Sequence, residues 1–230
     1  MSFPRATDAD VALLLEGTFP FVSGGVSSWV NQIIRAFPTL RFAIVFIGSR
    51  KEDYGEQKYA LPDNVVHLET HYLYDFSKVS GPTLPGQIDD KVHGDMLAIH
   101  NMFKRGHGDE AGNAAFRSLC EEMMPGGKLT DEQFLHGEQS WTLTCERYRQ
   151  YCTDPSFVDY FWTVRIMHAP LWQLARIAQE LIPARAYHSV STGYAGFLGA
   201  LLHHTRHRPL ILFEHGIYTK ERKIDLFKSE

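Results

Sequence analysis

The sequence predicts an α/β fold: a doubly wound parallel sheet of the Rossmann type with a helical insertion in its middle. Short, continuous apolar runs such as Asp10–Glu16 are typical of strands buried on both faces, which is the pattern of parallel sheets. Such runs occur near both ends of the chain, whereas Tyr72–Pro183 contains helical patterns and few strand signals. The order of strand, helix and strand at the start implies a βαβ unit with a right-handed crossover.

The first part of the chain supplies that βαβ unit. After the Asp10–Glu16 strand and a loop over Gly17–Gly25, apolar residues recur at spacings of three and four through Val26–Phe37, which predicts an amphipathic helix that ends at Pro38. Two further strands are predicted at Arg41–Ile47, ended by Gly48 and Ser49, and at Val65–Leu68.

The middle of the chain predicts helices joined by loops that are rich in proline and glycine. We expect loops at Gly81-Pro82 and Pro85-Gly86, helices at Asp89–Phe103 and Asp109–Met124, a helix start at Thr130, and a long helix at Pro155–Leu181 with a kink or break at Pro170. The long helix carries an apolar stripe of Phe161, Trp162, Ile166, Leu171, Leu174, Ile177 and Leu181. Core packing against the sheet explains this stripe better than a cofactor site does.

The sheet pattern returns at the end of the chain. A strand is predicted at Ala186–Val190, a helix rich in small residues at Gly193–His204, and a further strand at Leu210–Phe213. Because the two groups of strands share one pattern, we expect residues 1–230 to form a single doubly wound domain with an insertion over about 72–183.

Composition and charge exclude several classes of protein. The chain has 230 residues, 44% of them hydrophobic, a net charge of -4 and a pI near 6.3, which suits a soluble globular protein and not a nucleic-acid binder. The sequence contains neither a transmembrane run nor a secretory signal, so we expect a cytoplasmic protein. Cys120, Cys145 and Cys152 are odd in number and irregularly spaced, which predicts reduced thiols.

Two pairs of residues have the spacing of metal ligands without the expected setting. His203 and His207 lie four residues apart, but Arg206 and Arg208 beside them disfavour a cation, and the histidines suit a helix C-terminus. Asp8 and Asp10 precede the first strand, at the amino end of the sheet. We therefore expect no metal and no cofactor.

Ligands of open parallel sheets bind beyond the carboxyl ends of the strands, and three segments of this sequence fall there. The first is the loop into the first helix, with Ser23, Gly24, Gly25 and Val26. Glycine lets backbone N–H groups approach a ligand, and a helix N-terminus carries partial positive charge, so a phosphate fits this loop. A tight turn without a ligand is the alternative.

The other two segments follow the two late strands. His188 is followed by Ser191, Thr192, Gly193 and Tyr194, whose polar groups either cap the next helix or bind sugar hydroxyls. Glu214 and His215 end the last strand and precede Gly216, Tyr218, Glu221 and Arg222. Neither serine nor cysteine stands as a nucleophile beside this Glu-His pair, so the sequence gives little support to a hydrolytic triad.

Two of these segments carry a resemblance to a known family. Glu16–Trp29 (EGTFPFVSGGVSSW) and Glu214–Arg222 (EHGIYTKER) resemble the PelF family of glycosyltransferases of Pel exopolysaccharide synthesis, which are family-4 retaining enzymes. The resemblance extends over essentially the whole chain, including the helical insertion, and the His188 segment supports it less strongly.

The resemblance implies a GT-B enzyme with two Rossmann-like halves and a cleft between them. In it, the Gly24-Gly25 loop faces the donor phosphates, His188, His215 and Glu214 are the catalytic candidates, and the polar residues of both late segments bind substrate. The implied donor is a UDP-sugar and the implied acceptor a glycan, with an inner-membrane polysaccharide synthase complex as a further partner. The second half, which supplies most donor contacts, is absent from these 230 residues. We therefore expect the chain alone to be inactive.

The sequence departs from the wider superfamily at one position, and two other functions remain open. Many relatives carry an active-site histidine two positions beyond the equivalent of His188, where this sequence has Val190. Either His188 or His215 replaces that histidine, or the contact differs. The alternatives to a transferase are a non-catalytic module that binds acceptor glycan or a synthase complex, and a sugar-nucleotide epimerase of GT-B shape.

Overall fold

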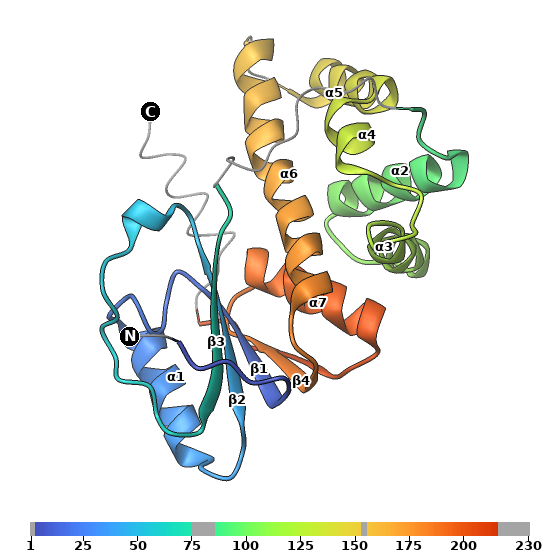
Figure 1. The fold of residues 1–230 in the computed structure, drawn as a ribbon. Helices are drawn as coiled ribbons and strands as arrows, with labels where there is room; N and C mark the ends of the chain where they lie inside the picture. Colours follow the sequence, from blue (N-terminus) through green and yellow to red (C-terminus); the bar gives the residue numbers. More distant parts are fainter. Residues whose placement is uncertain (1–2, 75–85, 153–155, 216–230) are drawn as a thin grey trace. The chain divides into compact units, whose positions relative to one another are not determined.

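The computed structural model describes residues 3–74, 86–152 and 156–215, which form two compact units (Figure 1). The sheet unit comprises residues 1–77 and 180–230, and the helical unit comprises residues 78–179. The division confirms the predicted helical insertion, because the chain leaves the sheet after its third strand and returns to it for the fourth.

The sheet unit contains five parallel strands in the order β3-β2-β1-β4-β5. Its strands are β1 (Ala9–Glu16), β2 (Phe42–Gly48), β3 (Val65–Tyr72), β4 (Ala184–Ser189) and β5 (Leu210–Leu212). Helix α1 (Gly25–Ala36) joins β1 to β2, helix α7 (Tyr194–Arg206) joins β4 to β5, and a short 3-10 turn, η1 (Lys51–Asp53), follows β2. This arrangement confirms the α/β fold with a Rossmann-like parallel sheet.

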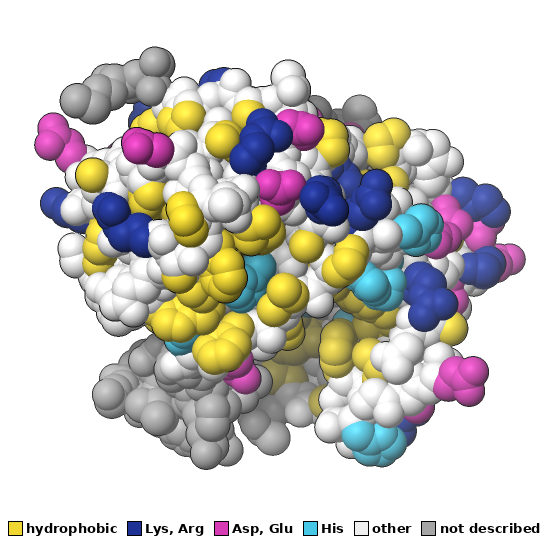
Figure 2. All heavy atoms as spheres, turned by 90° about the horizontal axis from the view of Figure 1, so that it is seen from below, with side chains coloured by type: hydrophobic (Ala, Val, Ile, Leu, Met, Phe, Trp, Pro, Cys, Tyr) yellow, Lys and Arg dark blue, Asp and Glu magenta, His cyan; other side chains and the backbone are white. Residues whose placement is uncertain are grey.

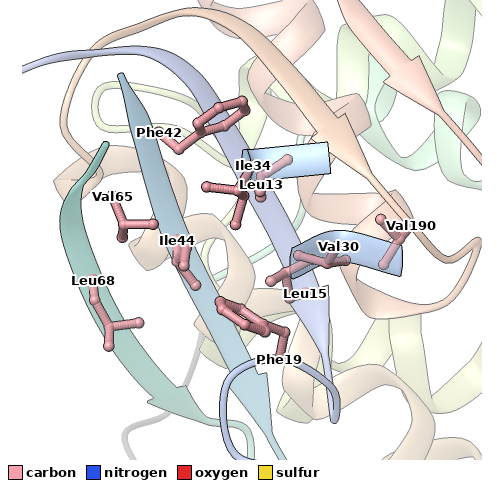
Figure 3. Packing of buried hydrophobic residues seen from close by; sticks show 10 residues of the cluster. All are labelled: Leu13, Leu15, Phe19, Val30, Ile34, Phe42, Ile44, Val65, Leu68 and Val190. Atoms are coloured by element: carbon pink, nitrogen blue, oxygen red, sulfur yellow. The ribbon is translucent and has the colours of Figure 1, made fainter. Parts of the chain in front are cut away.

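Strand β1 is central because both neighbours pair with it in register. Leu13 lies opposite Ile44 of β2 on one side and opposite His188 of β4 on the other. Successive side chains of a strand alternate between the two faces of the sheet. Leu13 and Leu15 belong to the apolar cluster that includes Val30 and Ile34 of α1, whereas Leu14 faces Gly199 of α7 (Figure 3). The two crossover helices therefore cover opposite faces.

The helical unit contains five helices: α2 (Asp90–Arg105), α3 (Glu110–Glu122), α4 (Asp131–His136), α5 (Glu138–Tyr151) and α6 (Phe157–Glu180), whose last residue belongs to the sheet unit. Side chains cap three of them: Asp89 accepts from Lys91 N and Val92 N, Asp109 from Gly112 N, and Thr130 from Gln133 N. These caps explain why the sequence predicted the starts of α2, α3 and α4 closely. No strand occurs in residues 86–152 or 156–179.

Helix α6 departs from two expectations. It continues through Pro170, so the predicted break does not occur. The apolar stripe is buried at Leu174, Ile177 and Leu181, but Trp162 and Ile166 are 55% and 53% exposed. The prediction of core packing along the whole stripe was therefore wrong for its first half. The predicted loop at Gly81-Pro82 lies outside the described residues.

The surface agrees with the charge pattern of the sequence. Basic and acidic side chains are interspersed over the face drawn in Figure 2, with hydrophobic side chains between them. Within the described part of the chain, no helix is long and apolar enough to span a bilayer.

We predict that Ile44→Ala lowers the free energy of unfolding of the sheet unit by about 2–5 kcal/mol, because truncating a fully buried side chain leaves a cavity in the centre of the sheet. Ile211→Ala is the matched control, since Ile211 lies in the same sheet but is 53% exposed. Urea titrations followed by circular dichroism measure both changes. Equal losses for the two variants would contradict the packing described here.

Candidate functional site

The three predicted segments converge at the carboxyl ends of β1, β4 and β5, which are neighbours in the sheet. The side chain of Trp29 in α1 contacts rings from both late segments. Its ring lies 5.8 Å from that of His188, 4.3 Å from that of His215 and 5.1 Å from that of Phe213, measured between centroids. Sequence spacing alone gave no reason to select Trp29 or Phe213, because an aromatic residue at such a position normally belongs to the core.

Polar contacts join the two late segments. Thr192 Oγ1 donates to Glu214 Oε1 at 3.0 Å, so the loop after β4 is bonded to the segment after β5. Ser191 Oγ lies 3.4 Å from Glu16 Oε2, at the end of β1. The structure therefore brings together Glu214, His215, His188, Ser191 and Thr192, as their positions at strand ends predicted.

Glu16 is a further site residue that the sequence interpretation missed. Its carboxylate caps α7: the backbone N–H groups of Tyr194 and Ala195 bond to it, the latter at 3.1 Å. Burial raises the pKa of Glu16 above its usual value of 4.5, and the hydrogen bonds from Ala195, Tyr194 and Ser191 oppose that rise. The sequence signal that could have identified Glu16 is a carboxylate at the end of a continuous apolar strand.

The cap at Glu16 excludes helix capping as the role of the hydroxyls after β4, and sugar binding stays a prediction. Gly193 is the N-cap residue of α7 and makes no side-chain cap bond, while Ser191 and Thr192 bond to Glu16 and Glu214 instead. These hydroxyls therefore do not cap α7. Gly193 is required for the close approach, since a Cβ there would lie 2.6 Å from Glu16 Oε2.

The glycine loop leads into the N-terminus of α1, which has no side-chain cap, whereas Glu16 caps the N-terminus of α7. Helix α1 has no acidic residue in its first turn and no side-chain cap. Ser23, Gly24 and Gly25 are exposed, whereas the side chain of Val26 packs against the apolar cluster. A Cβ on either glycine would meet no atom within 4 Å. Among the described residues, no atom therefore occupies the positions where side chains would start at Gly24 and Gly25.

Tyr59 supports the loop from outside the predicted segments. Gly24 N–H donates to Tyr59 Oη at 3.5 Å, and the Ser28 and Tyr59 hydroxyls lie 3.2 Å apart. The Tyr59 ring packs 5.2 Å from that of Phe19, which is fully buried. This anchoring holds the loop in one conformation without occupying the amides at the start of α1.

His188 is the most unusual polar group of the site. Burial lowers its pKa, and the nearby His215 lowers it further, so the imidazole is neutral at neutral pH. Its Nε2 atom is buried and has no hydrogen-bond partner in the described structure. Val190, two positions on, is 3% exposed and packs in the apolar cluster with Leu13 and Val30. The position at which many relatives carry a histidine is therefore part of the apolar core here.

The possible metal ligands have other partners. Asp8 pairs with Arg41 at 2.7 Å, and Asp10 accepts from Arg41 N at 2.9 Å. The imidazole Nδ1 of His203 bonds to the carbonyl of Arg208 at 2.8 Å. Across residues 3–74, 86–152 and 156–215, no group of three or more His, Cys, Asp or Glu side chains is arranged to hold a metal ion. In the described part of the chain, none of the three cysteines takes part in a disulfide.

Four predicted substrate-binding residues lie outside the described residues: Gly216, Tyr218, Glu221 and Arg222. Their roles remain predictions. Tyr194 is described, and its backbone N–H bonds to Glu16.

The sheet unit is a Rossmann-like α/β unit with polar residues at the carboxyl ends of its strands. Residues 9–230 match a family model described as a domain of unknown function, DUF3492, and the chain belongs to that family. Neither the curated proteins nor the solved structures that were compared contain a match to the chain.

We predict that Glu16→Gln changes how stability depends on pH. A carboxyl whose pKa is raised by folding stabilises the folded state fully below its unfolded pKa, and this contribution is lost as the pH rises through the folded value. Glutamine keeps an acceptor for Ala195 N–H but does not titrate. The stability of the variant relative to the wild type should therefore increase between pH 4 and pH 7, measured by urea titration at several pH values.

Glu56→Gln, at an exposed carboxyl, is the control for the loss of one negative charge. A stability difference between wild type and Glu16→Gln that stays constant with pH, or that moves in the opposite direction, would contradict the raised pKa of Glu16.

Proposed function

We propose that residues 1–230 form the acceptor-side half of a retaining GT-B glycosyltransferase. This enzyme transfers a hexose or N-acetylhexosamine from a UDP-sugar to a glycan in exopolysaccharide synthesis of the Pel type. One observation carries the proposal: the open, uncapped N-terminus of α1 adjoins the aromatic and imidazole cluster around Trp29. The resemblance of Glu16–Trp29 and Glu214–Arg222 to the PelF family adds the reaction type and the donor class.

The α1 N-terminus supplies what a departing nucleoside diphosphate requires. Negative charge builds up on the phosphates as the sugar leaves, and preorganised N–H groups stabilise it without reorganisation. Helix α7 cannot supply such groups at its own N-terminus, because Glu16 occupies the amides of Tyr194 and Ala195. The α1 amides, with no acidic side chain in the first turn, remain available for the donor.

The imidazole cluster suits the transferred sugar. Trp29 lies four residues after Gly25, about 6 Å along the helix axis, so the cluster is one sugar ring or less from the glycine loop. A neutral His188 can donate to a sugar hydroxyl or accept from it, and its unpaired Nε2 gains a partner when it does. Glu214, Thr192 and Ser191 add acceptors and donors at the same edge of the sheet.

In this proposal the nucleotide is held mainly by a second half that lies outside these 230 residues. The remaining partners are a glycan acceptor and an inner-membrane synthase complex. A non-catalytic module that binds acceptor glycan would use the same cluster without the α1 amides. A dependence of turnover on the glycine loop supports the transferase, because a non-catalytic module would not use that loop.

We predict that the 230-residue chain binds UDP-glucose with a dissociation constant well above the micromolar range. The sheet unit offers the α1 amides to the phosphates, but the proposal assigns the uridine and ribose contacts to the other half. Isothermal titration calorimetry with UDP-glucose measures the affinity. Micromolar binding by the chain alone would overturn this division of contacts.

We predict that Gly25→Val reduces turnover of the complete transferase by about a hundredfold, the usual cost of losing one preorganised donor. In the proposal, the added side chain holds the donor phosphates away from the α1 amides. No backbone atom opposes it, so the melting temperature should stay within about 4 °C of the wild type.

Gly94→Val is the matched control, because Gly94 is exposed in α2 and a Cβ there also meets nothing within 4 Å. Turnover and melting temperature are measured on the same preparations. If Gly25→Val turns over normally per folded molecule, or if its activity falls only with the folded fraction, the loop has no part in the reaction.

A further inference from the structure

The helical unit contains a cavity of about 640 Å³ that the site at the sheet does not use. Residues of four helices line it: α2, α4, α5 and α6. A volume of this size lies within the range of pockets for small organic ligands. All of its described lining residues belong to the helical unit, so the cavity is defined within that unit.

Much of the cavity wall is apolar and aromatic. Phe134, Trp141, Tyr160 and Phe161 line it, and the rings of Trp141 and Phe161 pack edge to face with centroids 5.7 Å apart. Trp141 is 50% exposed, although tryptophan normally loses most of its exposed area on folding. An apolar body the size of one or two rings would cover this wall.

Three cationic side chains line the same cavity and contact only neutral groups in the described structure. Lys104 Nζ lies 3.5 Å from the centroid of the Tyr151 ring. Arg147 donates to Tyr151 Oη at 3.4 Å and to Asn101 Oδ1 at 3.5 Å. Arg165 donates to the Nδ1 atom of His136 at 3.0 Å.

Other cations of the helical unit behave differently. Four of them pair with aspartate: Lys91 with Asp95, Arg105 with Asp109, Lys128 with Asp89, and Arg176 with Asp131. No aspartate or glutamate is among the described lining residues of the cavity. Among the described residues, these four cations are therefore paired with carboxylates, whereas those that line the cavity are not.

Arg147 gives the most direct indication of an anionic ligand. Its Nε atom is buried and has no hydrogen-bond partner in the described structure. An unpaired N–H of a charged group is costly to bury, and a bidentate carboxylate or phosphate is the partner that a guanidinium fits best. Lys104 and Arg165, on the walls formed by α2 and α6, add positive charge around it.

The two partly buried histidines of the cavity, His100 and His168, do not compensate this charge. Burial, with smaller effects from His168 and Arg147, lowers the pKa of His100 to about 4, so His100 is neutral at neutral pH. His168 is also neutral, since burial lowers its pKa, and its Nδ1 bonds to the carbonyl of Val164 at 2.7 Å. A neutral His168 that donates through Nδ1 presents Nε2 as an acceptor.

We propose that this cavity binds an amphipathic anion, a ligand with an apolar ring-sized body and a carboxylate or phosphate group. The acidic group bonds to Arg147, with Lys104 and Arg165 close to it, and the body packs on Phe134, Trp141 and Phe161. This site is independent of the glycosyltransferase proposal, because it uses no residue of the sheet unit.

Calorimetric titration of the whole chain with three matched probes tests the site: 1-naphthyl phosphate, 1-naphthaleneacetate and the neutral 1-naphthaleneethanol. At least one anion should bind with one-to-one stoichiometry and at least about tenfold more tightly than the alcohol. The better of the two anions identifies the acidic group. Equal affinity for all three probes, or no binding of either anion, overturns the proposal.

Arg147→Gln should weaken the anion by about tenfold or more and leave the affinity for the alcohol unchanged. Arg149→Gln is the matched control, since Arg149 is exposed on the same helix and does not line the cavity. Arg165→Gln provides a second test if Arg147→Gln fails to fold. Equal anion affinities for the Arg147 and Arg149 variants overturn the assignment.

Discussion

Strand β1 is buried along both faces because it has a strand on each side and a helix over each face, and the remaining sheet geometry follows from that position. Its side chains at Ala12–Leu15 are at most 1% exposed, so a slip of one residue in its register would exchange the two packed faces. The fixed register determines where β1 ends, and its last residue is Glu16. A carboxylate held there reaches the N-terminus of α7, which connects the central strand to the helix that follows β4.

The backbone N–H groups at the N-termini of α1 and α7 differ in their hydrogen-bond partners, and this difference sets the charge distribution at this edge of the sheet. The amides at the start of α7 bond to an internal carboxylate, which Gly193 admits because it has no Cβ. In the described structure, no side chain caps the start of α1, no acidic residue lies in its first turn, and a Cβ at either of its two glycines would meet no atom within 4 Å. Partial positive charge is therefore compensated at one helix and available at the other. In the proposed transferase, the donor phosphates therefore bind at the glycine loop of α1, away from the carboxylates of Glu16 and Glu214.

Most elements could be predicted from the sequence because their signals are local. Buried parallel strands are continuous apolar runs, and Asp89, Asp109 and Thr130 cap their helices with their own side chains. The site was predicted in part, since strand ends are visible in the sequence, and His188, Glu214 and His215 do come together near Trp29. Glu16, Trp29 and Tyr59 were missed because their roles depend on contacts between elements far apart in the chain. The exposed half of α6 was mispredicted for the same reason: an apolar stripe shows periodicity but not what lies opposite it.

Each unit has, in its candidate site, a buried polar atom that lacks a hydrogen-bond partner in the described structure. His188 Nε2 in the sheet unit and Arg147 Nε in the helical unit are both buried without a hydrogen bond in the described structure. Such groups cost stability, and the great majority of buried polar groups are paired, so an unpaired one calls for a specific explanation. The neutral imidazole of His188 suits a hydroxyl, whereas the permanent charge of Arg147 requires an anion. The two proposals therefore assign ligands of different chemistry to the two units: a sugar hydroxyl to His188 and an acidic group to Arg147.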